Sequence, residues 1–167
     1  MPKNTSAGGP EAMRKLLVHQ LSGHGAHISF AAAVKGFPVE LAGKRVPRLG
    51  HTAWGLVHHL RIAQWDILEY ARGVEHDPLP YPSGYWPKTA GPRDAREWVE
   101  TVRSFNRDLK AVQGMVLDPQ RDLFAPLRAD SPWSLLQQAT LLIDHNAYHI
   151  GQLVDLRMLL GVPVRDW

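Results

Sequence analysis

Apolar residues recur at intervals of three and four along four long stretches of the chain, a spacing typical of amphipathic helices. No stretch shows the alternation of apolar and polar residues that predicts a strand. Glycine and proline signals place the predicted helices at residues 10–35, 52–72, 92–116 and 131–161, the last beginning at Ser131 and Pro132. Four helices of this length predict an all-α fold, a four-helix bundle with long loops between the helices.

The first predicted helix and the connection after the second carry interruptions. Gly23 and Gly25 lie in the middle of residues 10–35 and predict a kink or break there, because glycine is a poor helix former. Residues 74–92, VEHDPLPYPSGYWPKTAGP, hold five prolines and two glycines. A connection this long inside a compact domain is usually functional or disordered. Its three aromatic residues favour a loop that covers a pocket, although plain core packing would need the same residues.

Length and charge limit the class of protein. The 167 residues fit one domain, which we place at residues 10–167 after a disordered tail at residues 1–9. The net charge is only +3 and the basic residues are scattered, so we expect no nucleic-acid partner. No secretory signal is visible, and no apolar run approaches the roughly 18 residues of a membrane helix. The sequence therefore predicts a cytoplasmic protein that makes no membrane contact and acts on a small molecule.

Two histidines in the run DHNAYHIGQL, residues 144–153, fall on the leucine-bearing face of the last predicted helix. His145 and His149 are four residues apart, so their Cβ atoms lie roughly 6 Å apart and both rings can reach one ion. The chain has nine histidines and no cysteine, so imidazole is the soft metal ligand that remains. The spacing alone is a weak signal, because a buried histidine is more often hydrogen-bonded to a carbonyl than bound to metal.

A metal site of imidazoles needs a third ligand from another helix, and the second predicted helix offers His51, His58 and His59. Apolar residues three and four positions away place His59 on the inward face, whereas His58 has a boundary-like face and His51 precedes the helix. His59 is therefore the preferred third ligand. His24 and His27, in the first stretch, are the second choice for ligands and could instead line a pocket.

The residues around these histidines argue against two common metal chemistries. Zinc proteases with the HExxH motif place a glutamate directly after the first histidine, where this chain has Asn146. Di-iron bundles need ExxH pairs, and none occurs in the sequence. Three neutral imidazoles instead suit one divalent ion, zinc or nickel, with a position open for water or substrate. Asp144, Asn146 and Gln152 are candidates for the hydrogen bonds that orient the ligands.

Three segments, WGLVHHLRIAQWDILEY, YPSGYWP and HNAYHIGQLVDLRMLLG, resemble the DinB-like (YfiT-type) superfamily of metal-binding four-helix bundles. The resemblance covers about residues 11–161. In that family three histidines hold the metal, and the matching positions here are His59, His145 and His149. Relatives often carry an acidic residue just before the second-helix histidine, where this chain has His58. The resemblance therefore leaves open whether His58 or His59 is the ligand.

The resemblance also implies an activity. Members of the wider superfamily include transferases and isomerases that use low-molecular-weight thiols such as bacillithiol or mycothiol. By analogy, the metal would activate a thiol for attack on an electrophile, and the protein would form a homodimer. His58, Tyr148 and Asp144 are then candidate catalytic groups that transfer protons or orient the site. Plain structural roles for the same side chains are a boundary residue, a helix-packing aromatic and a solvated carboxylate.

Two other functions fit the same residues. One is a metal-dependent hydrolase that uses the three histidines without a thiol cofactor. The other is a non-catalytic module, stabilised by metal, that binds a partner or dimerises. Turnover with and without added thiol distinguishes the first of these from a thiol transferase. A fold that melts on metal removal, together with no detectable turnover, would favour the second.

Overall fold

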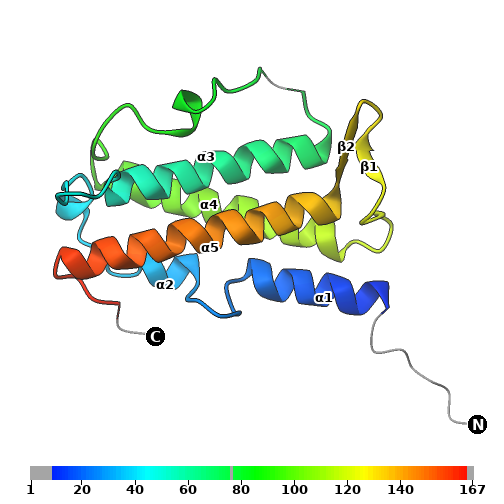
Figure 1. Ribbon diagram of the computed structural model, residues 1–167, viewed down its shortest axis with the longest axis horizontal. Helices are drawn as coiled ribbons and strands as arrows, with labels where there is room; N and C mark the ends of the chain where they lie inside the picture. Colours follow the sequence, from blue (N-terminus) through cyan, green and yellow to red (C-terminus); the bar gives the residue numbers. More distant parts are fainter. Residues whose placement is uncertain (1–8, 76, 165–167) are drawn as a thin grey trace, which may run out of the picture.

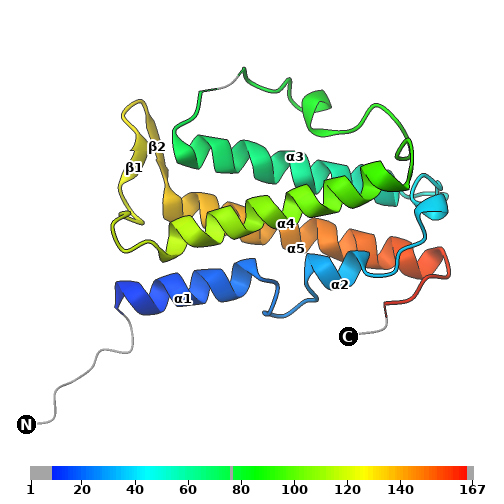
Figure 2. The same cartoon turned by 180° about the vertical axis from the view of Figure 1, so that it is seen from behind.

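The computed structural model describes residues 9–75 and 77–164 of the chain, and most of the predicted tail at residues 1–9 lies outside them. Within this part the chain folds as a bundle of four long helices that lie side by side, which confirms the all-α prediction (Figure 1). The long helices are α1 (Pro10–Leu21), α3 (Ala53–Arg72), α4 (Ala95–Leu117) and α5 (Leu135–Leu159). Figure 2 shows α4 on the opposite side of the bundle from the view of Figure 1. None of the described helices is long and apolar enough to cross a membrane.

The first predicted helix is broken, as its glycines indicated. Helix α1 ends at Leu21, and α2 (Phe30–Val34) resumes in the same layer of the bundle (Figure 1). Gly23 adopts a φ of 70°, and a Cβ there would lie 2.7 Å from the Cα of Ser29. Ser29 then caps α2 by accepting a hydrogen bond from the backbone N–H of Ala32 at 3.2 Å. Glycine at position 23 therefore fixes the geometry of the break.

The predicted boundaries of α3 are confirmed, whereas α4 begins later than expected. Thr52 caps α3 by accepting from the N–H of Gly55, and Gly73 follows the helix with a φ of 76°. Helix α4 begins at Ala95 and not at Pro92, because the side chain of Asp94 accepts from the N–H of Glu97 and sets the first turn there.

The start predicted for the last helix at Ser131 is wrong. Residues Ser131–Ser134 form strand β2, which pairs antiparallel with strand β1 (Pro126–Arg128). The helix begins at Leu135 because Ser134 and Gln137 cap it reciprocally, each side chain accepting from the other residue's backbone N–H. The hairpin escaped the sequence analysis because strands of three and four residues are too short to show an alternating pattern.

The core consists of two apolar clusters with a polar pair between them along α3 and α5. One cluster includes Trp54 and Leu153, and the other includes Leu68 and Leu142. In the sequence of each helix, Gln64 and Asn146 fall between the members of the two clusters. Asn146 donates from Nδ2 to Oε1 of Gln64 at 3.3 Å, and Gln64 donates to the carbonyl of Phe105 at 2.7 Å. These bonds hold α5, α3 and α4 in a fixed relation.

The connection between α3 and α4 runs over α3 and includes the short helix η2 (Ser83–Tyr85) (Figure 1). Its end is fastened to the start of α3. Thr52 donates from Oγ1 to the carbonyl of Ala90 at 2.7 Å, and Trp54 donates from Nε1 to Oγ1 of Thr89 at 3.2 Å. Residues 89 and 90 are therefore held against the N-terminal end of α3.

We predict that Ser134→Ala lowers the free energy of unfolding by about 1 kcal/mol, because it removes the N-cap of α5. Urea unfolding followed by circular dichroism measures the change. Thr140→Ala is the matched control, since the exposed Thr140 hydroxyl bonds only to carbonyls within the helix. Equal losses in the two variants would contradict the assigned role of Ser134.

Candidate metal centre

Three imidazoles meet between α3 and α5. His59 comes from α3, and His145 and His149 come from adjacent turns of α5. The Nε2 atom of His59 lies 2.9 Å from that of His145 and 3.1 Å from that of His149. One nitrogen from each ring lies within 4.8 Å of the other two, so the group could hold a metal ion. We call these three residues the histidine triad.

The hydrogen bonds on the far side of the rings define which nitrogens carry protons. The Nδ1 atom of His59 lies 2.9 Å from the carbonyl oxygen of Tyr85, which can only accept, so Nδ1 carries the hydrogen. His149 likewise places Nδ1 2.7 Å from Oε1 of Gln152. In the neutral rings both Nε2 atoms therefore present lone pairs to each other. Two lone pairs at this separation repel unless a cation lies between them.

The distances between the nitrogens also suit a metal ion. Zinc binds imidazole at about 2.0–2.1 Å, so two ligands of a tetrahedral site have nitrogens about 3.3 Å apart. The distances from His59 to the other two rings are close to this value. Small ring movements would therefore complete the ligand set, and the residues present fit a borderline divalent ion.

Burial keeps the triad neutral. The pKa of His59 falls from its ordinary value of 6.5 to about 4, mainly because the ring is desolvated, with repulsion from the two other triad histidines as a smaller cause. Burial also lowers the pKa of His145 and of His149. His59 and His149 are each only 8% exposed. Unprotonated imidazole is the form that binds a metal, so the fold prepares the ligands before any ion arrives.

The loop between α3 and α4 covers the triad through two residues. Tyr85 supplies the carbonyl that fixes His59, and its hydroxyl donates to Oδ2 of Asp66 on α3 at 2.8 Å. The indole of Trp86 stacks on the ring of His59, with centroids 4.0 Å apart and an angle of 3° between the planes. Trp86 also stacks on His51 at 4.0 Å. The other aromatic residue predicted to cover the pocket, Tyr81, is 89% exposed.

The structure brings the three preferred ligands together. The residues predicted to orient them have different surroundings. The structure brings His59, not His58, together with His145 and His149. Gln152 contacts His149, as expected for an orienting residue. Asn146 instead bonds to Gln64 in the core. Among the described residues, Nδ1 of His145 has no hydrogen-bond partner.

The three candidate catalytic residues lie at different distances from the triad. Tyr148 is 65% exposed and its ring meets that of His149 edge-on, with centroids 4.9 Å apart. Asp144 is exposed beside His145, and its charge acts to raise the pKa of that ring. His58 contacts the edge of Trp54 and lines a separate cavity with α4 residues such as Glu97. Neighbouring helix residues point about 100° apart, so His58 and His59 face different helices.

The second-choice ligands lie outside the triad. His24 lines a cavity at the break between α1 and α2, as the alternative role for these histidines anticipated. His27 forms a hydrogen bond between Nδ1 and the carbonyl of Ile28 at 2.8 Å. The roles of His51 and of the Tyr85 carbonyl in the site were missed, whereas Trp86 is one of the loop aromatics predicted to cover a pocket.

Comparison with known proteins agrees with this geometry. The sequence profile of the DinB superfamily matches residues 26–153. The matched region contains the whole triad, the covering loop and helices α2 to α4, together with most of α5. No curated protein and no solved structure gives a significant match to the chain.

We predict that the wild-type protein binds about one divalent ion per chain and that His59→Ala abolishes this binding, because only two triad nitrogens remain. His58→Ala is the matched control and retains the ion, since its ring lies outside the triad. Elemental analysis of protein purified without a histidine tag or nickel resin measures the ratio. Loss of metal in His58→Ala with retention in His59→Ala would reassign the ligand.

We also predict that the free energy of unfolding of the metal-free protein falls as the pH drops from 6.5 to about 4. In this window the unfolded chain binds a proton at His59 that the folded chain does not, so acid favours unfolding. Denaturant unfolding at a series of pH values measures the slope. His59→Gln has a shallower slope, because the titrating ring is gone. Identical slopes would show that His59 has an ordinary pKa in the folded protein.

Proposed function

The chain belongs to the DinB superfamily, and from this premise we propose that it is a divalent-metal-dependent enzyme that transfers a small thiol to an electrophile. The observation that carries the proposal is the convergence of three Nε2 atoms. Two of them present lone pairs, because the Nδ1 atoms of His59 and His149 donate hydrogen bonds to oxygen acceptors. Three imidazoles are the ligand number of catalytic rather than structural zinc sites, which leave one position for a reactant. Zinc or nickel is the ion that this nitrogen set favours.

The bound ion would supply one element of the chemistry, a lowered pKa for the thiol or water that it accepts. The chain supplies the rest. Tyr85 and Gln152 hold two triad rings in one orientation, and Trp86 excludes water from one face of His59. A dry and rigid site strengthens the electrostatic interactions that favour the anionic sulfur.

Protons have a route at the exposed side of the triad. Tyr148 lies there against the edge of His149, and Asp144 lies beside His145. We assign to this pair the passage of the thiol proton to solvent. Tyr85 has a different role, because burial and the Asp66 carboxylate raise its pKa to about 12 and keep its hydroxyl protonated. His58 faces α4 and has no part in this proposal.

The electrophile has a suitable place close to the triad. A cavity of about 390 Å³ lies between α3, α5, the covering loop and the β-hairpin, within the range typical of ligand pockets. Its walls include the aromatic side chains of Tyr70, Tyr85 and Trp133. Tyr85 belongs to both sites, since its carbonyl holds His59 and its ring lines this cavity. An apolar or aromatic electrophile would fit these walls.

The proposed reaction forms a carbon–sulfur bond. The thiol loses its proton to solvent by way of Tyr148, and the sulfur attacks an electrophilic carbon. The leaving group then departs with its electron pair. With 1-chloro-2,4-dinitrobenzene as test electrophile, the products are a thioether and chloride. Bacillithiol and mycothiol are the first thiols to test, because the superfamily includes enzymes that use them.

We predict that Gln152→Ala reduces thiol-dependent turnover of the zinc-loaded protein roughly 10–100-fold, because His149 loses the acceptor that orients it. Absorbance of the thioether measures the rate. Gln120→Ala, a change of the same kind at an exposed loop position, leaves the rate unchanged.

The same assay distinguishes the competing functions. Turnover of ester substrates without any thiol would replace the transferase by a hydrolase that uses the same triad. Zinc that raises the melting temperature without turnover of any electrophile would leave a structural metal site and overturn the catalytic proposal.

A further inference from the structure

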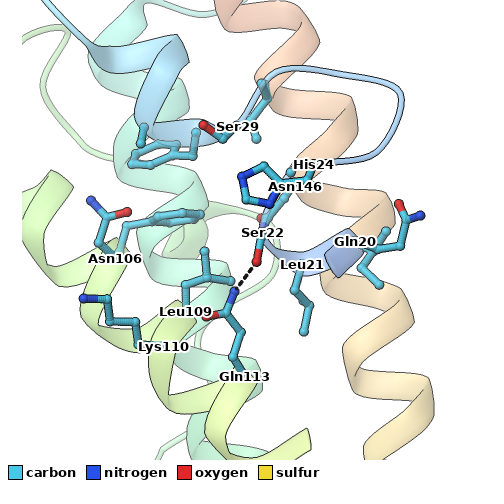
Figure 3. Close-up of a pocket in the computed structure, with 16 residues that line it drawn as sticks. Gln20, Leu21, Ser22, His24, Ser29, Asn106, Leu109, Lys110, Gln113 and Asn146 are labelled. Atoms are coloured by element: carbon cyan, nitrogen blue, oxygen red, sulfur yellow. Dashed lines mark hydrogen bonds between the residues drawn. The ribbon is translucent and has the colours of Figure 1, made fainter. Parts of the chain in front are cut away.

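A second cavity lies at the break between α1 and α2, about 460 Å³ in volume (Figure 3). Residues of the break, of α4 and of α5 line it. The α5 contribution comes from Ile143, Asn146 and Ile150, whereas the triad uses His145 and His149. With about 100° between successive helix residues, these two sets point roughly a third of a turn apart on α5. The cavity is therefore separate from the metal centre.

One wall of this cavity is apolar. Phe30 and Phe105 pack together there with ring centroids 3.9 Å apart, and both are almost completely buried. Leu21, Leu109 and Ile150 extend the same surface. A wall of this kind accepts the hydrocarbon or aromatic body of a small ligand.

The remaining wall is polar, with one positive charge and no negative charge. Figure 3 shows Asn106, Lys110 and Gln113 on α4, across from Ser22 and His24 at the break. No acidic residue is present among the described lining residues, so nothing in the cavity neutralises Lys110. In the part of the chain that the structure describes, the side chains of Lys110 and Asn106 form no hydrogen bond or ion pair. Lys110 is exposed, and its free ammonium beside the amide groups of Asn106 and Gln113 suits a carboxylate.

The cavity also contains a buried acceptor without a partner. Asn146 is 6% exposed, its Nδ2 bonds to Gln64, and its side chain also interacts with the ring of His145 and acts to raise the pKa of that ring. Among the described residues its Oδ1 has no hydrogen bond of ordinary geometry. Buried polar atoms in native proteins almost always have partners. A hydroxyl or N–H group on a ligand that reaches Asn146 would satisfy this atom.

The shape of the cavity depends on the rigid break. Gly23 adopts a left-handed conformation and packs against Ser29, so the chain turns sharply at one end of the opening. Ser22 accepts a hydrogen bond at Oγ from Nε2 of Gln113 at 3.0 Å, which ties the break to α4. The opening is thus held by specific contacts and does not require a ligand to form it.

We propose that this cavity is a second ligand site, which binds a small organic acid with an apolar or aromatic body. The carboxylate pairs with Lys110 and the donors near it, and the body packs on Phe30 and Phe105. A polar hydrogen on the ligand is expected to improve binding through Asn146. The site uses none of the three triad residues, and it would stand even if the proposed transferase activity failed.

The test uses the full-length, zinc-loaded protein with phenylacetate as the probe and phenylacetamide as its uncharged counterpart. Titration followed by amide NMR reports both the affinity and the place of binding. Phenylacetate shifts the signals of Phe30, Phe105 and Ile150, and phenylacetamide binds more weakly. Lys110→Met weakens phenylacetate roughly tenfold or more, because the ionic hydrogen bond is lost.

Two control variants make the result specific. Lys44→Met removes an exposed lysine outside the cavity and leaves the affinity unchanged. His59→Ala removes a triad ligand and also leaves the affinity unchanged, which excludes binding of the carboxylate to the metal. Equal affinities for Lys110→Met and wild type, or signal shifts confined to the triad, would overturn the proposal. An absence of binding of both phenylacetate and 4-hydroxyphenylacetate to the wild type would do the same.

Discussion

The candidate metal centre depends on two hydrogen bonds that point away from it. The Tyr85 carbonyl and the Gln152 amide oxygen each take the proton of an Nδ1 atom, so the opposite nitrogens of His59 and His149 face each other as lone pairs. This arrangement is unfavourable without a cation, because like partial charges lie about 3 Å apart in a desolvated place. Burial prevents protons from relieving it, since the pKa of His59 is lowered to about 4. A metal ion relieves the same repulsion without acid, and the fold therefore favours metal over proton.

The covering loop contributes by position more than by chemistry. The indole of Trp86 lies flat on the ring of His59. The hydroxyl of Tyr85 donates to Asp66, which lies further along α3 than His59. The loop end is fastened to the start of α3 by the hydrogen bonds of Thr52 and Thr89. These contacts make the loop part of the site wall, and they link the metal centre to the aromatic cavity beside it. A reactant in that cavity and a reactant at the metal would share Tyr85 as a neighbour.

Sequence reasoning succeeded where the information is local or periodic. Helical spacing gave the all-α bundle and the inward position of His59, and glycine chemistry gave the break near Gly23. It failed where the determinant is a contact between distant segments. The start of α5 at Ser134 depends on a short strand pairing, and the acceptor of His59 is a backbone carbonyl from the loop. A backbone carbonyl has no residue identity, so no motif could indicate that of Tyr85.

The amide pair in the core, Gln64 and Asn146, sets the register of the two helices that carry the site. These side chains can form their hydrogen bond at only one axial offset of α3 against α5. A slide by one helical turn, about 5.4 Å, would leave both amides among apolar side chains without this bond. The same slide would carry the imidazoles of α5 past their counterpart on α3. The geometry of the histidine triad therefore depends on two residues that are not among its members.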